Sequence, residues 1–156
     1  MQSDLLAKNL LMLESEYKNF NHLKIHTQYS ICEGAVKIDT LKDKAKEFKI
    51  KSLGLCDTSN LCGALEFAEK ISKSGTQPII GTQINFKYAN TTGLLPLFAL
   101  NENGYKRIIE LSSLSFLKND QMSDPHLDFD DLLNKTDGVA LFSGTINGLF
   151  GQLFDK

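Results

Sequence analysis

Hydrophobic and polar residues alternate along the stretch HLKIHT, residues 22–27. One face carries the apolar side chains of Leu23 and Ile25. The other face carries the polar side chains of His22, Lys24 and His26. A repeat of two residues is typical of a β-strand whose two faces meet different surroundings. We therefore predict a strand that ends at His26.

Further along the chain, segments with helical periodicity alternate with short apolar runs. Helices are predicted at residues 37–48, 60–75 and 103–117. Strands are predicted at residues 51–57, 77–86, 94–100 and 137–143. A short helical turn is expected within residues 126–135, and a further helix is expected after Thr145. Strands and helices that alternate in this way indicate βαβ units, a parallel sheet and the α/β fold class.

The first 19 residues are predicted to form a separate element. One face of a helix there would carry the side chains of Leu6, Leu10, Leu13 and Tyr17. We predict an amphipathic leader helix at residues 1–19 that docks on the rest of the protein or on a partner. No linker-like change in composition divides residues 20–156, so we treat them as one domain.

The composition of the 156 residues fits a globular protein of about one domain. The net charge is −2 and the lysines are scattered among acids, so the chain lacks the clustered basic face that nucleic acid binding requires. Its three cysteines form no C-x-x-C motif, which favours a reducing compartment. No apolar run approaches the roughly 20 residues of a membrane span. The N-terminus lacks the basic start of a signal peptide. We therefore expect a cytoplasmic protein without membrane contact.

Polar side chains follow the ends of the first two predicted strands. His26 ends the first strand, Asp57 ends the second, and Glu66 lies on the following helix. In a parallel α/β barrel, the functional residues gather at the C-terminal ends of the strands. Imidazole and carboxylate groups that converge there suit a divalent metal site for phosphate ester hydrolysis. The alternative is that these are polar groups satisfied within the protein, without a metal.

Three motifs in order resemble a known family. They are H-L-x-x-H-T-x-Y-S at residues 22–30, D-x-x-N-L-x-G-x-x-x-F at 57–67, and P-I-I-G at 78–81. Together with NENGYKRIIELSS and DGVALFSG further along, they resemble the PHP domain of bacterial DNA polymerase III alpha subunits, over about residues 20–148. The resemblance implies a PHP-type (β/α) barrel preceded by an N-terminal helix. Because such barrels take roughly 250 residues, we expect only the first four to five βα units here, with the domain incomplete at its C-terminus.

The chain departs from the family pattern at two metal-ligand positions. Metal-binding members read H-L-H-x-H in the first strand, where this chain has Lys24, and T-D-H-G-N after the second, where it has Thr58. The resemblance implies a vestigial metal site at His22, Lys24, His26, Asp57, Thr58 and Glu66. We expect no catalytic residue and no bound metal in this segment. If a metal did bind, its ligands would be His26, Asp57 and Glu66.

Lys24 suggests what replaces the cation. A charged lysine has three donors and no acceptor, so it does not ligate a metal. Our hypothesis is that Lys24 supplies the positive charge itself by pairing with Asp57 or Glu66. The alternative is that its side chain extends into solvent at the end of the strand.

Two further groupings are not interpreted as functional sites. Asp128 and Asp130 in DFD follow a proline and precede an apolar run, which is typical of a helix N-terminus rather than of paired polymerase aspartates. Cys32, Cys56 and Cys62 fit no common zinc spacing.

Three functions remain open. The first is a fragment of a replicative DNA polymerase III alpha subunit, in which this PHP segment is a non-catalytic scaffold and docking surface. The resemblance then implies the rest of the alpha chain, the proofreading exonuclease subunit and the replicative holoenzyme as partners. DNA and Mg²⁺ would be bound only by the parent polymerase. The second function is a stand-alone metal-dependent phosphoesterase of the PHP superfamily, and the third is a binding module unrelated to replication.

Overall fold

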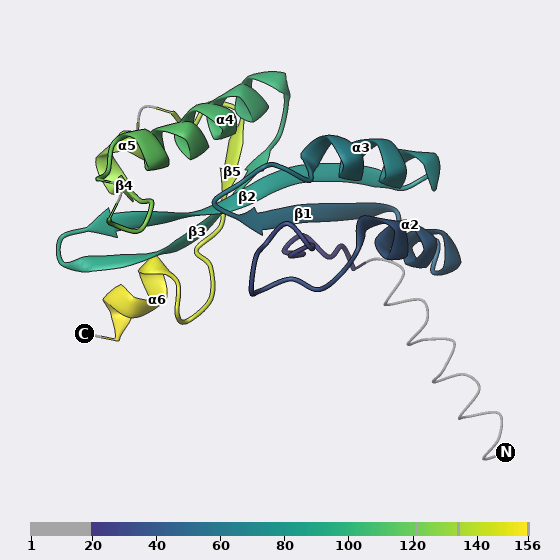
Figure 1. Ribbon diagram of the computed structural model, residues 1–156, viewed down its shortest axis with the longest axis horizontal. Coiled ribbons are helices and arrows are strands. Elements are labelled where there is room, and N and C mark those ends of the chain that lie inside the picture. The colour runs from purple at the N-terminus through teal and green to yellow at the C-terminus, as the bar shows by residue number, and fades with distance from the viewer. Residues whose placement is uncertain (1–19, 121, 134, 156) are drawn as a thin grey trace, which may run out of the picture.

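A mixed β-sheet forms the centre of the protein in the computed structural model, which describes residues 20–155 apart from 121 and 134 (Figure 1). The sheet contains β1 (Ser52–Thr58), β2 (Gln77–Tyr88), β3 (Thr91–Ala99) and β5 (Val139–Leu141) in that order, and β4 (Leu127–Asp128) pairs with β2. The helices are α2 (Ile38–Glu47), α3 (Ala64–Lys73), α4 (Glu102–Leu117), α5 (Phe129–Leu133) and α6 (Leu149–Phe154). Figure 1 shows α3 and α4 on one side of the sheet and α6 on the other. The α/β class is confirmed, and the sheet is open.

The prediction of an all-parallel sheet is wrong for two of the strand pairs. β1 runs parallel to β2, and β4 also runs parallel to β2. β3 is antiparallel to both β2 and β5. The reason is the connection: Tyr88 pairs with Thr91, so only two residues join β2 to β3. A two-residue turn makes a hairpin, whereas a parallel crossover needs about a dozen residues.

The first predicted strand is reduced to isolated bridges. Ile25 forms a parallel bridge with Leu55, and Cys56 N–H donates to the Ile25 carbonyl at 2.8 Å. The segment therefore lies beside β1 in the predicted direction. It forms no continuous ladder because the chain turns at Thr27, whose carbonyl accepts from Ser30 N–H at 2.9 Å. A Cβ on Gly54 would lie 2.3 Å from the Leu23 carbonyl oxygen, so this close approach requires glycine.

The predicted helices are confirmed where the structure describes them. α2, α3 and α4 lie within the three predicted segments, apart from one residue at the start of α4, and α6 lies within the tail predicted to be helical. Gly75 follows α3 with a φ of +82°, a conformation that favours glycine after a helix. The side chain of Asn101 caps α4 by accepting a hydrogen bond from Gly104 N–H at 2.9 Å. The predicted leader helix at 1–19 lies outside the described residues.

Pro96 lies within β3 although proline disfavours a central strand. Its carbonyl accepts from Phe142 N–H at 3.0 Å, just beyond the last β5 residue. In a strand, the N–H and C=O of one residue point to the same side. The missing N–H of Pro96 therefore faces the end of β5, where the β2–β3 ladder does not need it.

Two apolar clusters hold the helices on the sheet. One joins Leu53 and Leu55 of β1 to Phe67 and Ile71 of α3, with Ile38 of α2. The other joins the second half of β2 and β3 to α4, α5 and α6; its buried members include Ile84, Phe86, Leu95, Leu97, Ile108, Leu111, Leu132 and Leu149. The cluster members alternate along each strand, but β1 is buried on both faces. No helix in the described part of the chain is both long and apolar enough to cross a membrane.

Candidate functional site

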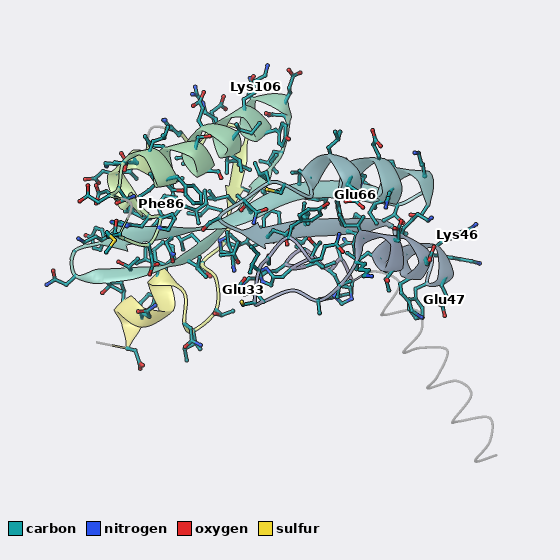
Figure 2. The ribbon with its side chains drawn as sticks, in the orientation of Figure 1. Glu33, Lys46, Glu47, Glu66, Phe86 and Lys106 are labelled. Atoms are coloured by element: carbon teal, nitrogen blue, oxygen red, sulfur yellow. The ribbon has the colours of Figure 1, made fainter. Side chains whose placement is uncertain are left out.

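The candidate site lies at the C-terminal end of β1, beside the middle of β2. Thr58, the last residue of β1, is in register with Gln83 of β2. Residues 27–36, which we call the strand-end loop, fold back against the end of β1. Figure 2 shows Glu33 in this loop and Glu66 on α3, well apart from one another. The predicted site residues therefore divide into separate groups.

Asp57 is fully buried and is satisfied by the first turn of the strand-end loop. Its Oδ1 accepts from Thr27 N–H at 2.6 Å and from the Ser30 hydroxyl at 2.7 Å. Its Oδ2 accepts from the Thr27 hydroxyl at 2.7 Å. Each of these donors is neutral. A buried carboxylate with several donors is a stable arrangement, and here it fastens the loop to the end of β1.

Glu66 belongs to a different network, on the helical side of the sheet. Its carboxylate accepts from the Tyr29 hydroxyl at 2.7 Å and from Lys70 Nζ at 2.8 Å. Lys70 also contacts Asp39 Oδ1 at 2.7 Å, which ties α3 to α2. The hydrogen bond from Lys70, followed by that from Tyr29, lowers the pKa of Glu66. The hydrogen bond to Glu66 in turn raises the pKa of Tyr29.

The predicted pairing of Lys24 with Asp57 or Glu66 is wrong. Both carboxylates are bound by the other donors just described, and the Lys24 side chain is exposed, as the alternative proposed. An ion pair with Asp57 would require burying the ammonium group, which is costly. Burial raises the pKa of the Cys56 thiol to about 12, and the charge of Lys24 offsets only part of this effect. Cys56 is therefore a protonated core residue at neutral pH.

A second polar group joins the end of β1 and the middle of β2 to the far part of the strand-end loop. Gln83 Nε2 donates to the Thr58 hydroxyl at 2.7 Å, and this hydroxyl donates to Glu33 Oε2. His26 Nδ1 lies 4.0 Å from the same Glu33 oxygen, beyond the length of a direct hydrogen bond. Gln83 is 2% exposed, and Glu33 lies at the surface. His26 and Thr58, two of the predicted site residues, are thus brought together by Glu33.

His22 does not take part in either group. Its imidazole is exposed and packs edge-on against Phe20 with the ring centres 4.7 Å apart. Only its backbone contributes to the sheet, through a carbonyl that accepts from Gly54 N–H at 2.8 Å.

Comparison with known proteins assigns this arrangement to a family. The sequence profile of the PHP domain matches residues 22–156. The chain belongs to the PHP domain family. Three relatives carry the name DNA polymerase III subunit alpha. The protein of Rickettsia felis is 37% identical over 134 residues, which cover 85% of this chain and 11% of the relative. That of Caulobacter vibrioides is 34% identical over 152 residues, which cover 92% of this chain and 13% of the relative. That of Borreliella burgdorferi is 35% identical over 147 residues, which cover 86% of this chain and 13% of the relative.

This PHP chain therefore spans little more than a tenth of the length of the relatives it matches. Solved structures are more distant. A candidate metal-dependent phosphoesterase from Bifidobacterium adolescentis is 16% identical with a TM-score of 0.47, and the match covers 74% of this chain and 42% of that one. An amidohydrolase from Chromobacterium violaceum has the same identity and TM-score, and the match covers 60% of this chain and 34% of that one.

The described residues of this chain do not by themselves gather the ligands of a metal site. In the described ranges, no three His, Cys, Asp or Glu side chains are grouped so that they could hold one ion. Asp57 and Glu66 have donors on their oxygens, and they serve different networks. His26 and Glu33 are the only two ionisable side chains of the second polar group, which is fewer than the three protein ligands of a catalytic zinc site. The absence of a bound metal remains a prediction.

Sequence reasoning missed several residues of this site. Thr27 and Ser30 lie within the first motif, but their hydroxyls were not recognised as the partners of Asp57. Gln83 lies two residues after the P-I-I-G motif, at the position in register with Thr58. The signal that would have found Gln83 is a polar residue within the strand next to β1, opposite the last residue of β1. Glu33 carried no comparable signal, because its role depends on the path of the loop.

The run around Asp128 is structural, as the sequence indicated. Lys118 contacts Asp128 Oδ2 at 2.7 Å and Asp131 Oδ2 at 2.6 Å. These contacts join the end of α4 to the start of α5, whose first turn contains Asp130 and Asp131. The hydrogen bond from Lys118 lowers the pKa of Asp128.

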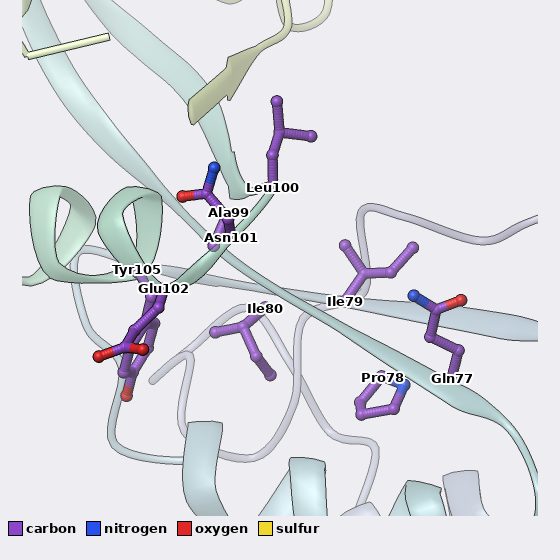
Figure 3. A pocket seen from close by; sticks show the side chains of 9 residues that line it. All are labelled: Gln77, Pro78, Ile79, Ile80, Ala99, Leu100, Asn101, Glu102 and Tyr105. Atoms are coloured by element: carbon purple, nitrogen blue, oxygen red, sulfur yellow. The ribbon is translucent and has the colours of Figure 1, made fainter. Parts of the chain in front are cut away.

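A shallow pocket of about 290 Å³ lies elsewhere on the sheet, between the start of β2 and the start of α4 (Figure 3). Its apolar part is formed by Pro78, Ile79, Ile80 and Leu100, and its polar rim includes Glu102 and Tyr105. It is separate from the strand-end site, and none of the predicted site residues lines it.

Proposed function

We propose that this chain is the PHP segment of a bacterial DNA polymerase III alpha subunit and serves there as a non-catalytic scaffold. The parent protein would be a DNA-directed DNA polymerase that uses Mg²⁺, while this segment would use no cofactor. Its partners would be the remainder of the alpha chain, the proofreading exonuclease subunit and the replicative holoenzyme. DNA would be contacted only through the parent enzyme.

One observation carries the scaffold proposal. Asp57, the buried acid at the strand ends, is satisfied by Thr27 and Ser30 and fastens a loop. A carboxylate used in this way supports the fold, and its neighbours Lys24 and Thr58 supply no imidazole to share a metal with it. The identities of 34–37% to polymerase alpha subunits support the choice of parent protein.

The parent protein is tested by reading the gene beyond the codon for Lys156. We expect an open frame of the length of the alpha-subunit relatives. A stop codon at this position would contradict the assignment to a polymerase and favour a short stand-alone protein.

The scaffold role is tested by incubating the chain with a generic phosphomonoester and with Zn²⁺, Mn²⁺ or Mg²⁺. We expect no turnover, and no stoichiometric metal retained after dialysis without chelator. A His26→Ala variant provides the matched control. Turnover that is present in the wild-type chain and lost in this variant would establish the stand-alone phosphoesterase instead.

A further inference from the structure

The strand-end loop is fixed at its two ends by contacts that do not involve Glu33. Its first turn is held by Asp57, as described above. Its last residue, Val36, forms a parallel bridge with Thr27 and accepts from Gln28 N–H at 3.0 Å. Near the middle, Gly34 N–H donates to the Ser30 carbonyl at 2.9 Å. The loop is therefore a compact unit held at its first turn and at its last residue, and Glu33 lies in its exposed part between them.

Glu33 makes that contact. It follows Cys32, whose φ of +66° turns the chain back toward the sheet. The Glu33 carboxylate accepts from the Thr58 hydroxyl, which in turn accepts from the buried amide of Gln83. One exposed loop residue is thereby connected to two adjacent strands through a single hydroxyl. A hydrogen bond to a charged acceptor is stronger than one between neutral groups.

The same group contains polar atoms that remain buried behind Glu33. Among the described residues, the buried side-chain atoms without a hydrogen-bond partner are His26 Nδ1 and Gln83 Oε1. Gln83 is bonded to Thr58 through its other amide atom, and His26 faces Glu33. His26 Nδ1 and Gln83 Oε1 are therefore shielded from solvent, while the rest of the His26 side chain remains 25% exposed.

We propose that Glu33 is an internal strap that closes the strand-end loop over Thr58, Gln83 and His26. While Glu33 is bonded to Thr58, these side chains are engaged or covered within the chain and do not receive a ligand. The strap is a local device, so it is independent of whether the chain belongs to a polymerase.

Amide hydrogen exchange of the 156-residue chain tests the strap. Two hydrogen-bonded amides of the loop, those of Gln28 and Gly34, serve as its reporters. In Glu33→Ala, we expect their protection factors to fall about fivefold to tenfold, because one partly exposed, charge-assisted hydrogen bond is lost. Glu33→Gln keeps an oxygen that accepts from Thr58, so the protection factors should fall less in this variant than in Glu33→Ala. Thr58→Val removes the donor, and the double variant with Glu33→Ala should show no further loss.

Glu47→Ala is the matched control. Glu47 also accepts from a nearby side chain, Lys44 at 2.8 Å, but it lies at the end of α2, away from Glu33 (Figure 2). Its removal should leave the protection of Gln28 and Gly34 unchanged. The amides of Ile108 and Leu111 in α4 report on the whole fold and should be unchanged in every variant.

A chemical readout distinguishes the strap from a general loosening. Acylation by diethyl pyrocarbonate, followed by mass spectrometry, should increase at His26 in Glu33→Ala and stay constant at His22 and His126. Equal protection and equal His26 reactivity in Glu33→Ala and the wild type would overturn the proposal. A loss in Glu33→Ala that is equally large in α4 would also overturn it, because Glu33 would then support the fold as a whole.

Discussion

Asp57 shows how a single residue can stabilise this fold without an ion. Its carboxylate replaces the hydration of a buried charge by three hydrogen bonds from Thr27 and Ser30. The donors come from a turn that is about 30 residues away in the chain, and the bonds join the loop to the sheet. Such a residue is expected to matter more for stability than for chemistry.

At the residue scale, we expect Asp57→Asn to lower the free energy of unfolding by about 1–3 kcal/mol. The asparagine amide group is a donor, so it would oppose at least one of the donors that Asp57 now accepts from. Urea denaturation measures the effect, and Asp43→Asn is the control because Asp43 is exposed and only loosely paired with Lys42. Equal stability of the two variants would show that Asp57 does not anchor the loop.

At the scale of elements, α2 and α3 are joined by charged side chains as well as by apolar ones. Lys70 of α3 reaches Asp39 of α2 at 2.7 Å and Glu66 at 2.8 Å. Its hydrogen bonds lower the pKa of both carboxyl groups. Tyr29 of the strand-end loop joins this network through Glu66, so the loop is bound to α3 as well as to β1.

This network predicts a specific dependence of stability on pH. The pKa values of Asp39 and Glu66 are lower in the folded protein than their ordinary values of 3.8 and 4.5. Their contribution is therefore fully present above about pH 4.5 and is lost as the pH falls through the folded pKa values. In Lys70→Met, the melting temperature should depend less steeply on pH between 7 and 3. Lys106→Met, which removes an exposed pair with Glu102, should keep the wild-type slope.

The segment before the loop depends on a glycine in β1. Gly54→Ala would place a methyl group 2.3 Å from the Leu23 carbonyl oxygen, and the backbone would have to move. We expect a loss of about 1–3 kcal/mol in stability, which is typical of overpacking. Gly75→Ala is the comparison variant, because Gly75 has a positive φ but open space around it. If Gly54→Ala left the bond between Cys56 N–H and the Ile25 carbonyl as well protected from exchange as in the wild type, the close-packing argument would be wrong.

At the scale of the whole molecule, β5 lies at one end of the described sheet and pairs only with β3 within it. The apolar side chains at that edge include Leu141 and Phe142, and further apolar surface is exposed at Ile146 and at Phe154 of α6, which is 90% exposed. Leu149, at the start of α6, is in contrast fully buried. An open strand edge beside apolar surface favours association between chains.

We therefore expect the 156-residue chain to self-associate or to be poorly soluble. Light scattering and binding of a dye to apolar surface measure this at matched concentrations. A chain extended by roughly 100 residues of the parent sequence should approach the size of a closed barrel and remain monomeric. Phe154→Lys should weaken the association of the short chain. A monodisperse, cooperatively unfolding monomer of residues 1–156 would contradict the open-edge argument.

The elements of this protein, and which of their faces are buried, could be predicted from the sequence. The helices α2, α3 and α4 follow from the spacing of their apolar residues, and Gly75 marks the C-terminal end of α3. These signals are local, because a periodic pattern reports which side of an element is buried. The family motifs also identified the region around Asp57 as the candidate site.

Only the tertiary structure decided which partners these faces and side chains meet. The antiparallel direction of β3 depends on the two-residue turn between β2 and β3. The strands predicted from the sequence were shorter, so the connection between them was predicted to be longer than it is. Asp57, Glu33 and Gln83 find partners that are 25 to 30 residues away in the sequence. A periodic pattern contains no information about such distant pairs. Lys24 remained unpaired with Asp57 because neutral donors already satisfied that carboxylate, and this follows from the path of the loop rather than from charge.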